Sequence, residues 1–189
     1  MATLSRELPM PNVKHIATLN QAHATLLHCY NKVSRFAQAY AAARTPSNKD
    51  EVPFEERQQF TQWLDRWERA FTDYLTSNMP SMGNNELTQC RVLKANHLAC
   101  VVLIATTGPS KPDFDKFETD FEAIVELSGA VRQARQSKES PTSATSSPIA
   151  IATRAGLDVQ DPLHIVITYC TRPDLRSRAN ELSLRLHRQ

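Results

Sequence analysis

The sequence predicts an all-α protein, and three observations lead to this fold class. Glycine accounts for only 4 of the 189 residues, which leaves little material for the tight turns of β-hairpins. Apolar residues recur at spacings of three and four over long stretches, which is the period of an amphipathic helix. Hydrophobic residues make up 41% of the chain and charged residues 22%, as in ordinary globular proteins. We therefore expect a single helical domain over residues 1–189, in which about six helices pack as antiparallel neighbours around an apolar third helix.

The first two helices are expected in the N-terminal part of the chain, after a flexible N-terminus at 1–11. The first should run from about Asn12 to Ala43, with Asn12 as its N-cap and Pro46 marking its exit. The second should span about Glu55 to Thr76, because its aromatic and aliphatic residues repeat at helical spacing while charges of both signs alternate between them. Each of these helices is predicted to bury one face.

The third helix, about Glu86 to Thr107, is the predicted centre of the core. Its second half, Leu98 to Ala105, is apolar on every face, which suits a helix surrounded by others. This apolar run of eight residues is much shorter than the roughly 20 needed to cross a bilayer, so no membrane span is expected. Gly108 and Pro109 should end the helix, one by its permissive backbone and the other by its missing amide hydrogen.

A fourth helix is expected to start near Asp113. Acidic residues crowd its first half and Arg132 and Arg135 lie near its end, an arrangement that complements the helix dipole. Residues 137–149 are rich in serine, threonine and proline and offer almost nothing to bury, so this segment should be a disordered loop.

The C-terminal helical segment, 162–189, is predicted to contain two more helices. Asp161 and Pro162 form an N-cap and first-position pair. The β-branched run from Ile165 to Thr168 would also suit a strand, but we favour a helix because the chain offers no partner strand. Thr171 and Asp174 resemble a capping box that starts the last helix. The apolar stripe of that helix consists of Leu175, Ala179, Leu182 and Leu186.

Charge and cysteine content limit the compartment and the partners. The net charge is +2, and five arginines between Arg172 and Gln189 concentrate the basic character in the last helix. Such a weak overall charge does not require nucleic acid as a partner. The four cysteines form no CxxC pair, and no apolar leader precedes them, so we expect reduced thiols in a soluble intracellular protein.

The sequence offers little for a metal or an active site. His97 and Cys100 are the only ligand pair one helical turn apart, and Cys90 lies too far along the same helix to join them. A buried histidine and a buried thiol are the better interpretation, and we expect neither a metal nor another cofactor. The chain has no GxSxG or HExxH motif and no paired acids of characteristic spacing, so no catalytic residues are assigned and an enzyme is not expected.

The most distinctive stretch runs from Gly156 to Leu186. A Pro-Leu pair leads through an apolar segment to a cysteine, then to Arg-Pro and an arginine-rich helix with leucines. The residues that carry this pattern are Pro162, Leu163, Cys170, Arg172, Pro173, Leu175, Arg176, Arg178, Ala179 and Leu182. The pattern resembles one near the C-terminus of fungal transcription regulators that carry a six-cysteine binuclear zinc cluster. The order of the preceding helices extends this resemblance from about Phe54 to Leu186.

The resemblance implies a helical regulatory region in the nucleus, with protein partners either in the transcription machinery or through self-association. Two departures limit it. The six-cysteine cluster is missing from this sequence, so neither zinc binding nor direct sequence-specific DNA binding is expected. Thr171 also separates Cys170 from Arg172, where the family more often joins cysteine directly to arginine.

Two other functions stay open at this point. One is a small-ligand-binding or enzymatic module that uses a pocket between the third helix and the segment that begins at Pro162. The other is weak, nonspecific nucleic-acid binding through the basic last helix, although a solvated face, or arginines that pair with acids of neighbouring helices, is the better interpretation of these arginines.

Overall fold

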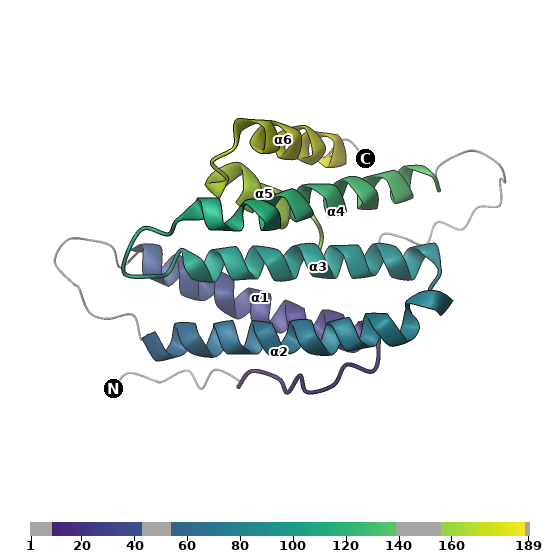
Figure 1. The fold of residues 1–189 in the computed structure, drawn as a ribbon, viewed down its shortest axis with the longest axis horizontal. Coiled ribbons are helices and arrows are strands. Elements are labelled where there is room, and N and C mark those ends of the chain that lie inside the picture. Colours follow the sequence, from purple (N-terminus) through teal and green to yellow (C-terminus); the bar gives the residue numbers. More distant parts are fainter. Residues whose placement is uncertain (1–8, 43–53, 139–155, 188–189) are drawn as a thin grey trace.

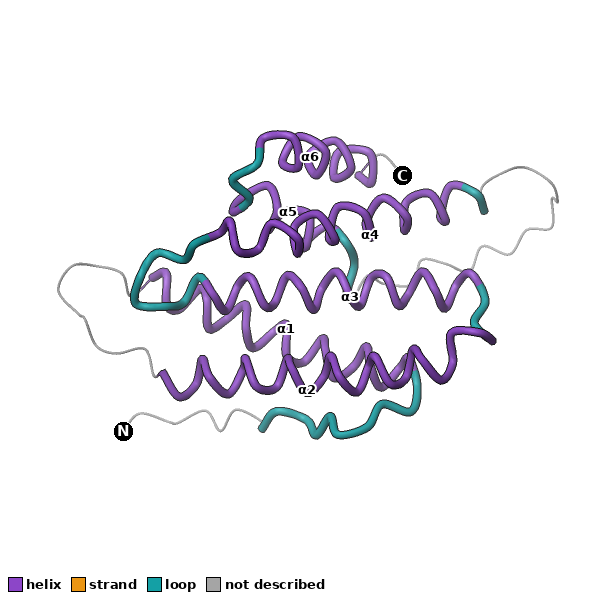
Figure 2. The backbone as a smooth tube through the Cα atoms, in the orientation of Figure 1, coloured by secondary structure: helices purple, strands orange, loops and turns teal. Residues whose placement is uncertain are grey.

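A computed structural model describes residues 9–42, 54–138 and 156–187, and within these ranges the fold is entirely helical (Figures 1 and 2). The α-helices are α1 (Leu19–Ala42), α2 (Phe54–Asn78), α3 (Asn84–Ala105), α4 (Glu118–Gln136), α5 (Gln160–Tyr169) and α6 (Pro173–His187). Two short 3₁₀ turns, η1 (Met79–Ser81) and η2 (Phe114–Phe117), precede α3 and α4. The all-α prediction is confirmed. Except for 9–11 and 137–138, the expected flexible N-terminus and disordered loop lie outside the described residues.

Helix α3 lies in the middle of the molecule, as its apolar sequence predicts. Helices α1 and α2 cover one side of it, α4 and α5 cover the other, and α6 packs on the outside of α4 and α5 (Figure 1). The successive helices α2, α3 and α4 run antiparallel (Figure 1). Among the described helices only α3 is long and apolar enough to cross a membrane, and 61% of its most apolar window is buried in the bundle, as in the core helices of soluble proteins.

The core consists of two clusters of buried side chains on opposite sides of α3. The first cluster joins α3 to α4, α5 and α6 through residues such as Phe121, Ile124 and Leu163. The second joins α3 to α1, α2 and the segment before α1, and it contains both tryptophans, Trp63 and Trp67. Helix α3 contributes to both clusters, because its apolar residues point in all directions around its axis.

The first helix begins at Leu19, seven residues after the predicted N-cap, so the prediction for its start was wrong. The side chain of Asn12 accepts a hydrogen bond from the amide of Lys14 at 3.1 Å and therefore stabilises a local turn. The helix is capped instead at Thr18, whose Oγ1 accepts from the amide of Gln21 at 3.1 Å. The segment before α1 is not helical. It packs against α2, where the indole of Trp63 donates to the carbonyl of Pro11 at 2.8 Å.

The starts of the later helices also differ in detail from the prediction. The segment after Asp113 first forms η2, and α4 begins only at Glu118. Helix α5 starts at Gln160 with Val159 at its N-cap, so Asp161 is not the cap; its carboxylate instead accepts a hydrogen bond from Tyr30 on α1. The preference for a helix over a strand at Ile165–Thr168 is confirmed.

The predicted capping box at the start of α6 does not form. The hydroxyl of Thr171 donates to Asp115 at 2.7 Å, and the carboxylate of Asp174 pairs with Arg172. Both side chains therefore bind other side chains instead of the backbone amides that they were expected to cap. The local pattern was compatible with a cap, but partners brought close by the tertiary fold compete for the same side chains.

Candidate functional site

Most of the residues that carry the family resemblance build the corner between α5 and α6. Leu163, Cys170 and Leu175 are buried in the first core cluster, at 0%, 3% and 0% exposure. Pro162 is buried as well, and Pro173 occupies the first position of α6, where its missing amide hydrogen costs nothing. These residues hold the corner together, so their contacts are structural.

Arg172 ties this corner to the neighbouring helix. Its guanidinium donates to the carboxylate of Glu118 at the start of α4 at 2.7 Å, and it also pairs with Asp174. Hydrogen bonds from Arg172 hold the pKa of Asp174 below its ordinary value. The arginine therefore links the start of α6 to the start of α4, while its guanidinium and the two carboxylates stay partly open to solvent.

The other arginines of α6 differ in whether they border a groove between α4 and α6. Arg178 donates to Glu126 on α4 at 2.5 Å, and Arg185 pairs with Glu181 one turn earlier on α6. Together with Arg132 of α4 these two arginines line a groove of about 580 Å³ between α4 and α6, which Leu182 also borders. Arg176 is exposed and does not line this groove. The structure thus separates Arg178 and Leu182, which share one surface, from Arg176, which does not.

Arg132 differs from the other two arginines of the α4–α6 groove. Its Nε is buried and has no hydrogen-bond partner among the described residues, and no carboxylate pairs with its guanidinium there. The two glutamates that border the groove, Glu126 and Glu181, are already paired with Arg178 and Arg185. Within the described residues the groove therefore contains one arginine without a carboxylate partner, and its buried Nε is a donor of the kind that is rarely left unpaired in folded proteins.

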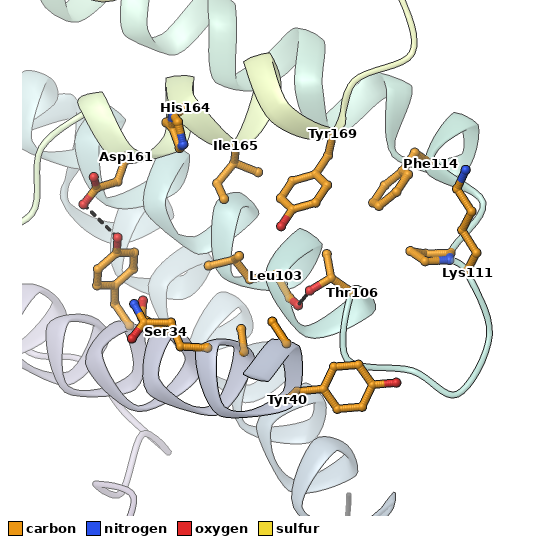
Figure 3. Close-up of a pocket in the computed structure, with 15 residues that line it drawn as sticks. Ser34, Tyr40, Leu103, Thr106, Lys111, Phe114, Asp161, His164, Ile165 and Tyr169 are labelled. Atoms are coloured by element: carbon orange, nitrogen blue, oxygen red, sulfur yellow. Dashed lines mark hydrogen bonds between the residues drawn. The ribbon is translucent and has the colours of Figure 1, made fainter. Parts of the chain in front are cut away.

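A second concave site lies between α1, the end of α3 and α5, close to where the sequence suggested a ligand pocket. Its volume is about 530 Å³, and Figure 3 shows its lining side chains converging from the three helices and from the loop before η2. Ala37, Leu103 and Ile165 provide apolar surface, and the rings of Phe114 and Tyr169 stack with their centroids 5.2 Å apart. We refer to this site as the α1–α5 pocket.

The α1–α5 pocket contains an acidic side chain, Asp161, and a basic side chain, Lys111. The phenol of Tyr30 donates to Asp161 at 2.7 Å, while Lys111 lies by Phe114, away from that carboxylate (Figure 3). Burial, and then the hydrogen bond to Asp161, raise the pKa of Tyr30 above its ordinary value, so the phenol stays protonated. The hydroxyl of Thr106 donates to the carbonyl of Leu103 at 2.6 Å. The pocket thus combines apolar walls with a small number of oriented polar groups, as ligand sites do.

Cys100 belongs to the second core cluster, and His97 packs beside it. These two residues were considered as possible metal ligands from their spacing in the sequence. The ring of His97 is 2% exposed, stacks on Trp67 and lies with its Nε2 3.0 Å from the carbonyl of Leu64. Cys100 packs against the thiol of Cys29, and this contact together with burial raises the pKa of Cys29. No group of three potential metal ligands occurs within residues 9–42, 54–138 and 156–187.

Because His97 is buried, the protein should lose stability as the pH falls. Burial, and then the charge of Lys94, lower the pKa of His97 below 6.5, so the unfolded chain takes up a proton that the folded chain does not. The stabilising contribution is complete above pH 6.5 and is lost toward the lower folded pKa, at about 1.4 kcal/mol per pH unit. His97→Gln should show a shallower fall in the free energy of unfolding between about pH 7.5 and 5.5, measured by urea titration. Equal slopes in the two proteins would contradict this role of His97.

Searches against protein-family models, curated proteins and solved structures each find no match to this chain.

The sequence suggested the approximate place of the α1–α5 pocket but not the residues that line it. Its key side chains are Tyr30, Lys111, Asp161, His164 and Tyr169, which come from α1, a loop and α5. One local signal was present, because Ser34, Ala37 and Ala41 place small residues on one face of α1 where large ones would fill the space. The remaining residues are too far apart in the sequence for spacing to connect them.

Proposed function

We propose that this chain is the helical regulatory domain of a nuclear transcription regulator and that it contacts a protein partner through the groove between α4 and α6. The regulatory role rests on the resemblance carried by Pro162 to Leu182. The choice of surface rests on one observation: Arg132 pairs with no carboxylate of the described residues and lies in a groove that Arg178 and Arg185 also line.

The partner that suits this groove is a protein segment that carries a carboxylate. Each glutamate of the groove is already paired with one arginine, so an incoming carboxylate meets the half-buried guanidinium of Arg132, which pairs with no carboxylate among the described residues. Arginine binds carboxylates in a planar, two-pronged geometry, which gives direction as well as attraction. Leu182, Val125 and Ala130 add apolar surface beside the charge, so both parts of an amphipathic acidic segment find a counterpart.

Fusing the chain to an unrelated DNA-binding module upstream of a reporter gene tests this proposal. We expect the fusion to change reporter output relative to the module alone. Arg132→Gln should remove most of that change, because losing one charge-assisted hydrogen bond weakens binding by about tenfold. Arg176→Gln is the matched control, since it removes an exposed arginine of the same corner that lies outside the groove.

Two outcomes would count against the proposal. If the fusion gives the same output as the DNA-binding module alone, the regulatory role fails. If Arg132→Gln and Arg176→Gln both behave as the unmodified fusion does, the groove is not the contact surface. Circular dichroism of each variant checks that the helical fold is intact, which we expect because neither Arg132 nor Arg176 belongs to a core cluster.

A further inference from the structure

The α1–α5 pocket is an elongated groove that runs along α5. Among the residues that α5 contributes to its lining, Asp161, Ile165 and Tyr169 follow one another at intervals of one helical turn (Figure 3). By helix rise, the first and the last of them are about 12 Å apart. The volume of the groove, about 530 Å³, falls within the range of roughly 300–1,000 Å³ that is usual for ligand sites. A ligand that fills the groove must therefore be elongated.

Hydrogen bonds at one end of the groove converge on Asp161. The phenol of Tyr30 donates to its carboxylate at 2.7 Å (Figure 3), and Ser34 forms a hydrogen bond with the same phenol. Burial and the contact with Asp161 raise the pKa of Tyr30, whereas the contact with Ser34 lowers it. These opposite effects are those of a phenol that donates to Asp161 and accepts from Ser34. The carboxylate of Asp161 is therefore the acceptor at the end of this chain.

Asp161 has no cationic partner among the described residues. Its carboxylate belongs to none of their ion pairs. Lys111, which also lines the groove, lies by Phe114 at the opposite end (Figure 3). A carboxylate can accept several hydrogen bonds, and within the described part of the chain this one accepts from the side chain of Tyr30. An ammonium group would supply both the opposite charge and three further donors.

The remainder of the groove is mainly apolar. Leu103 of α3 and Ile165 of α5 lie between the two ends (Figure 3), and Ala37 of α1 adds a further apolar side chain. At the far end the rings of Phe114 and Tyr169 stack with their centroids 5.2 Å apart. Hydrocarbon that covers these side chains is removed from water, which is favourable in proportion to the area buried. The body of the ligand should therefore be apolar, with its polar group at the acidic end.

From this arrangement we infer that the α1–α5 pocket binds an elongated apolar amine, with the ammonium group at Asp161 and the hydrocarbon body extending past Ile165 toward Tyr169. This site is separate from the α4–α6 groove, and the inference does not depend on the proposed regulatory function. An amine of about nine non-hydrogen atoms should bind with a Kd on the order of 1 mM.

Titration of the ¹⁵N-labelled protein with octylamine at neutral pH, followed by amide chemical shifts, tests the inference. We expect saturable shifts at the residues of α1 and α5 that line the groove. Butylamine should bind roughly tenfold more weakly or worse, because its shorter chain buries less apolar surface. Octanoate has a chain of the same length and the opposite charge, so it should bind at least about fivefold more weakly than octylamine.

Two variants assign these preferences to residues. Asp161→Asn should weaken the binding of octylamine about fivefold, because the ammonium group loses its ion pair. Asp73→Asn is the matched control, since it makes the same change at an exposed aspartate of α2 that lies outside the groove. Ala37→Phe fills the groove from α1 and should abolish the binding of octylamine. Circular dichroism checks that each variant is folded.

Several results would overturn the inference. Absence of saturable shifts up to about 10 mM octylamine, tenfold above the expected Kd, would show that the groove does not take this class of ligand. Octanoate that binds as tightly as octylamine, or equal effects of Asp161→Asn and Asp73→Asn, would remove the role of Asp161. Unchanged binding in a folded Ala37→Phe variant would place the amine elsewhere on the protein.

Discussion

Replacing Trp67 with alanine should lower the free energy of unfolding by about 3–5 kcal/mol, the range seen when large aromatic side chains are removed from cores. Trp67 is fully buried at the centre of the second core cluster, stacked on Phe71 and on His97. Its indole also donates to the hydroxyl of Thr25 on α1, at 3.1 Å. The substitution therefore creates a cavity between three helices and removes a buried hydrogen bond at the same time.

Trp67→Phe separates these two contributions. Phenylalanine retains most of the aromatic packing but leaves the Thr25 hydroxyl without its donor, so the expected loss is smaller, about 1–3 kcal/mol. Urea unfolding followed by circular dichroism measures both variants. A loss of less than about 1 kcal/mol for Trp67→Ala would mean that α2 is not held by this core as described.

Leu175→Ala should cost about 2–5 kcal/mol, the usual penalty for truncating a fully buried leucine. Leu175 stands in the first turn of α6 and is completely buried in the first core cluster. It is also one of the residues on which the resemblance to fungal regulators rests. If its contribution is packing, as its burial indicates, the variant should weaken the attachment of α6 to α4 and α5.

Leu184→Ala is the matched control for Leu175→Ala, because it makes the same change on the same helix at a position that is 52% exposed. We expect its effect on stability to stay within about 0.5 kcal/mol. Thermal or urea unfolding of the two variants side by side gives the comparison. Similar losses in both would contradict the placement of α6 described above.

The sequence was sufficient to predict the fold class because five of the six helices keep their apolar residues on a clear helical period. The error at the start of α1 shows where that signal misleads. Val13 and Ile16 continue the spacing that leads into Leu19, and both are buried, but they pack from a non-helical segment. The spacing of apolar residues therefore indicates which side chains are buried, but not where the helix begins. Its start is set by Thr18, whose side chain caps the first turn.

The candidate sites were predictable only in part. The motif from Pro162 to Leu182 drew attention to the correct region, yet its buried members serve the corner between α5 and α6. Arg132 lies 46 residues before Arg178, and nothing in the local sequence around either residue indicates that they share a groove. The polar ends of the α1–α5 pocket likewise depend on a contact between Tyr30 and Asp161, which are 131 residues apart.

Because α3 belongs to both core clusters, the molecule can unfold locally on either side of this helix. Helices α1 and α2 bury their apolar faces against one side of α3, and α4 to α6 bury theirs against the other. Each outer group can therefore loosen as a separate cooperative unit while α3 keeps its contacts with the remaining one. The hydrogen bonds from Tyr30 to Asp161 and from the amide of Leu157 to His23 join the two units without passing through α3, so separation of the units would break both.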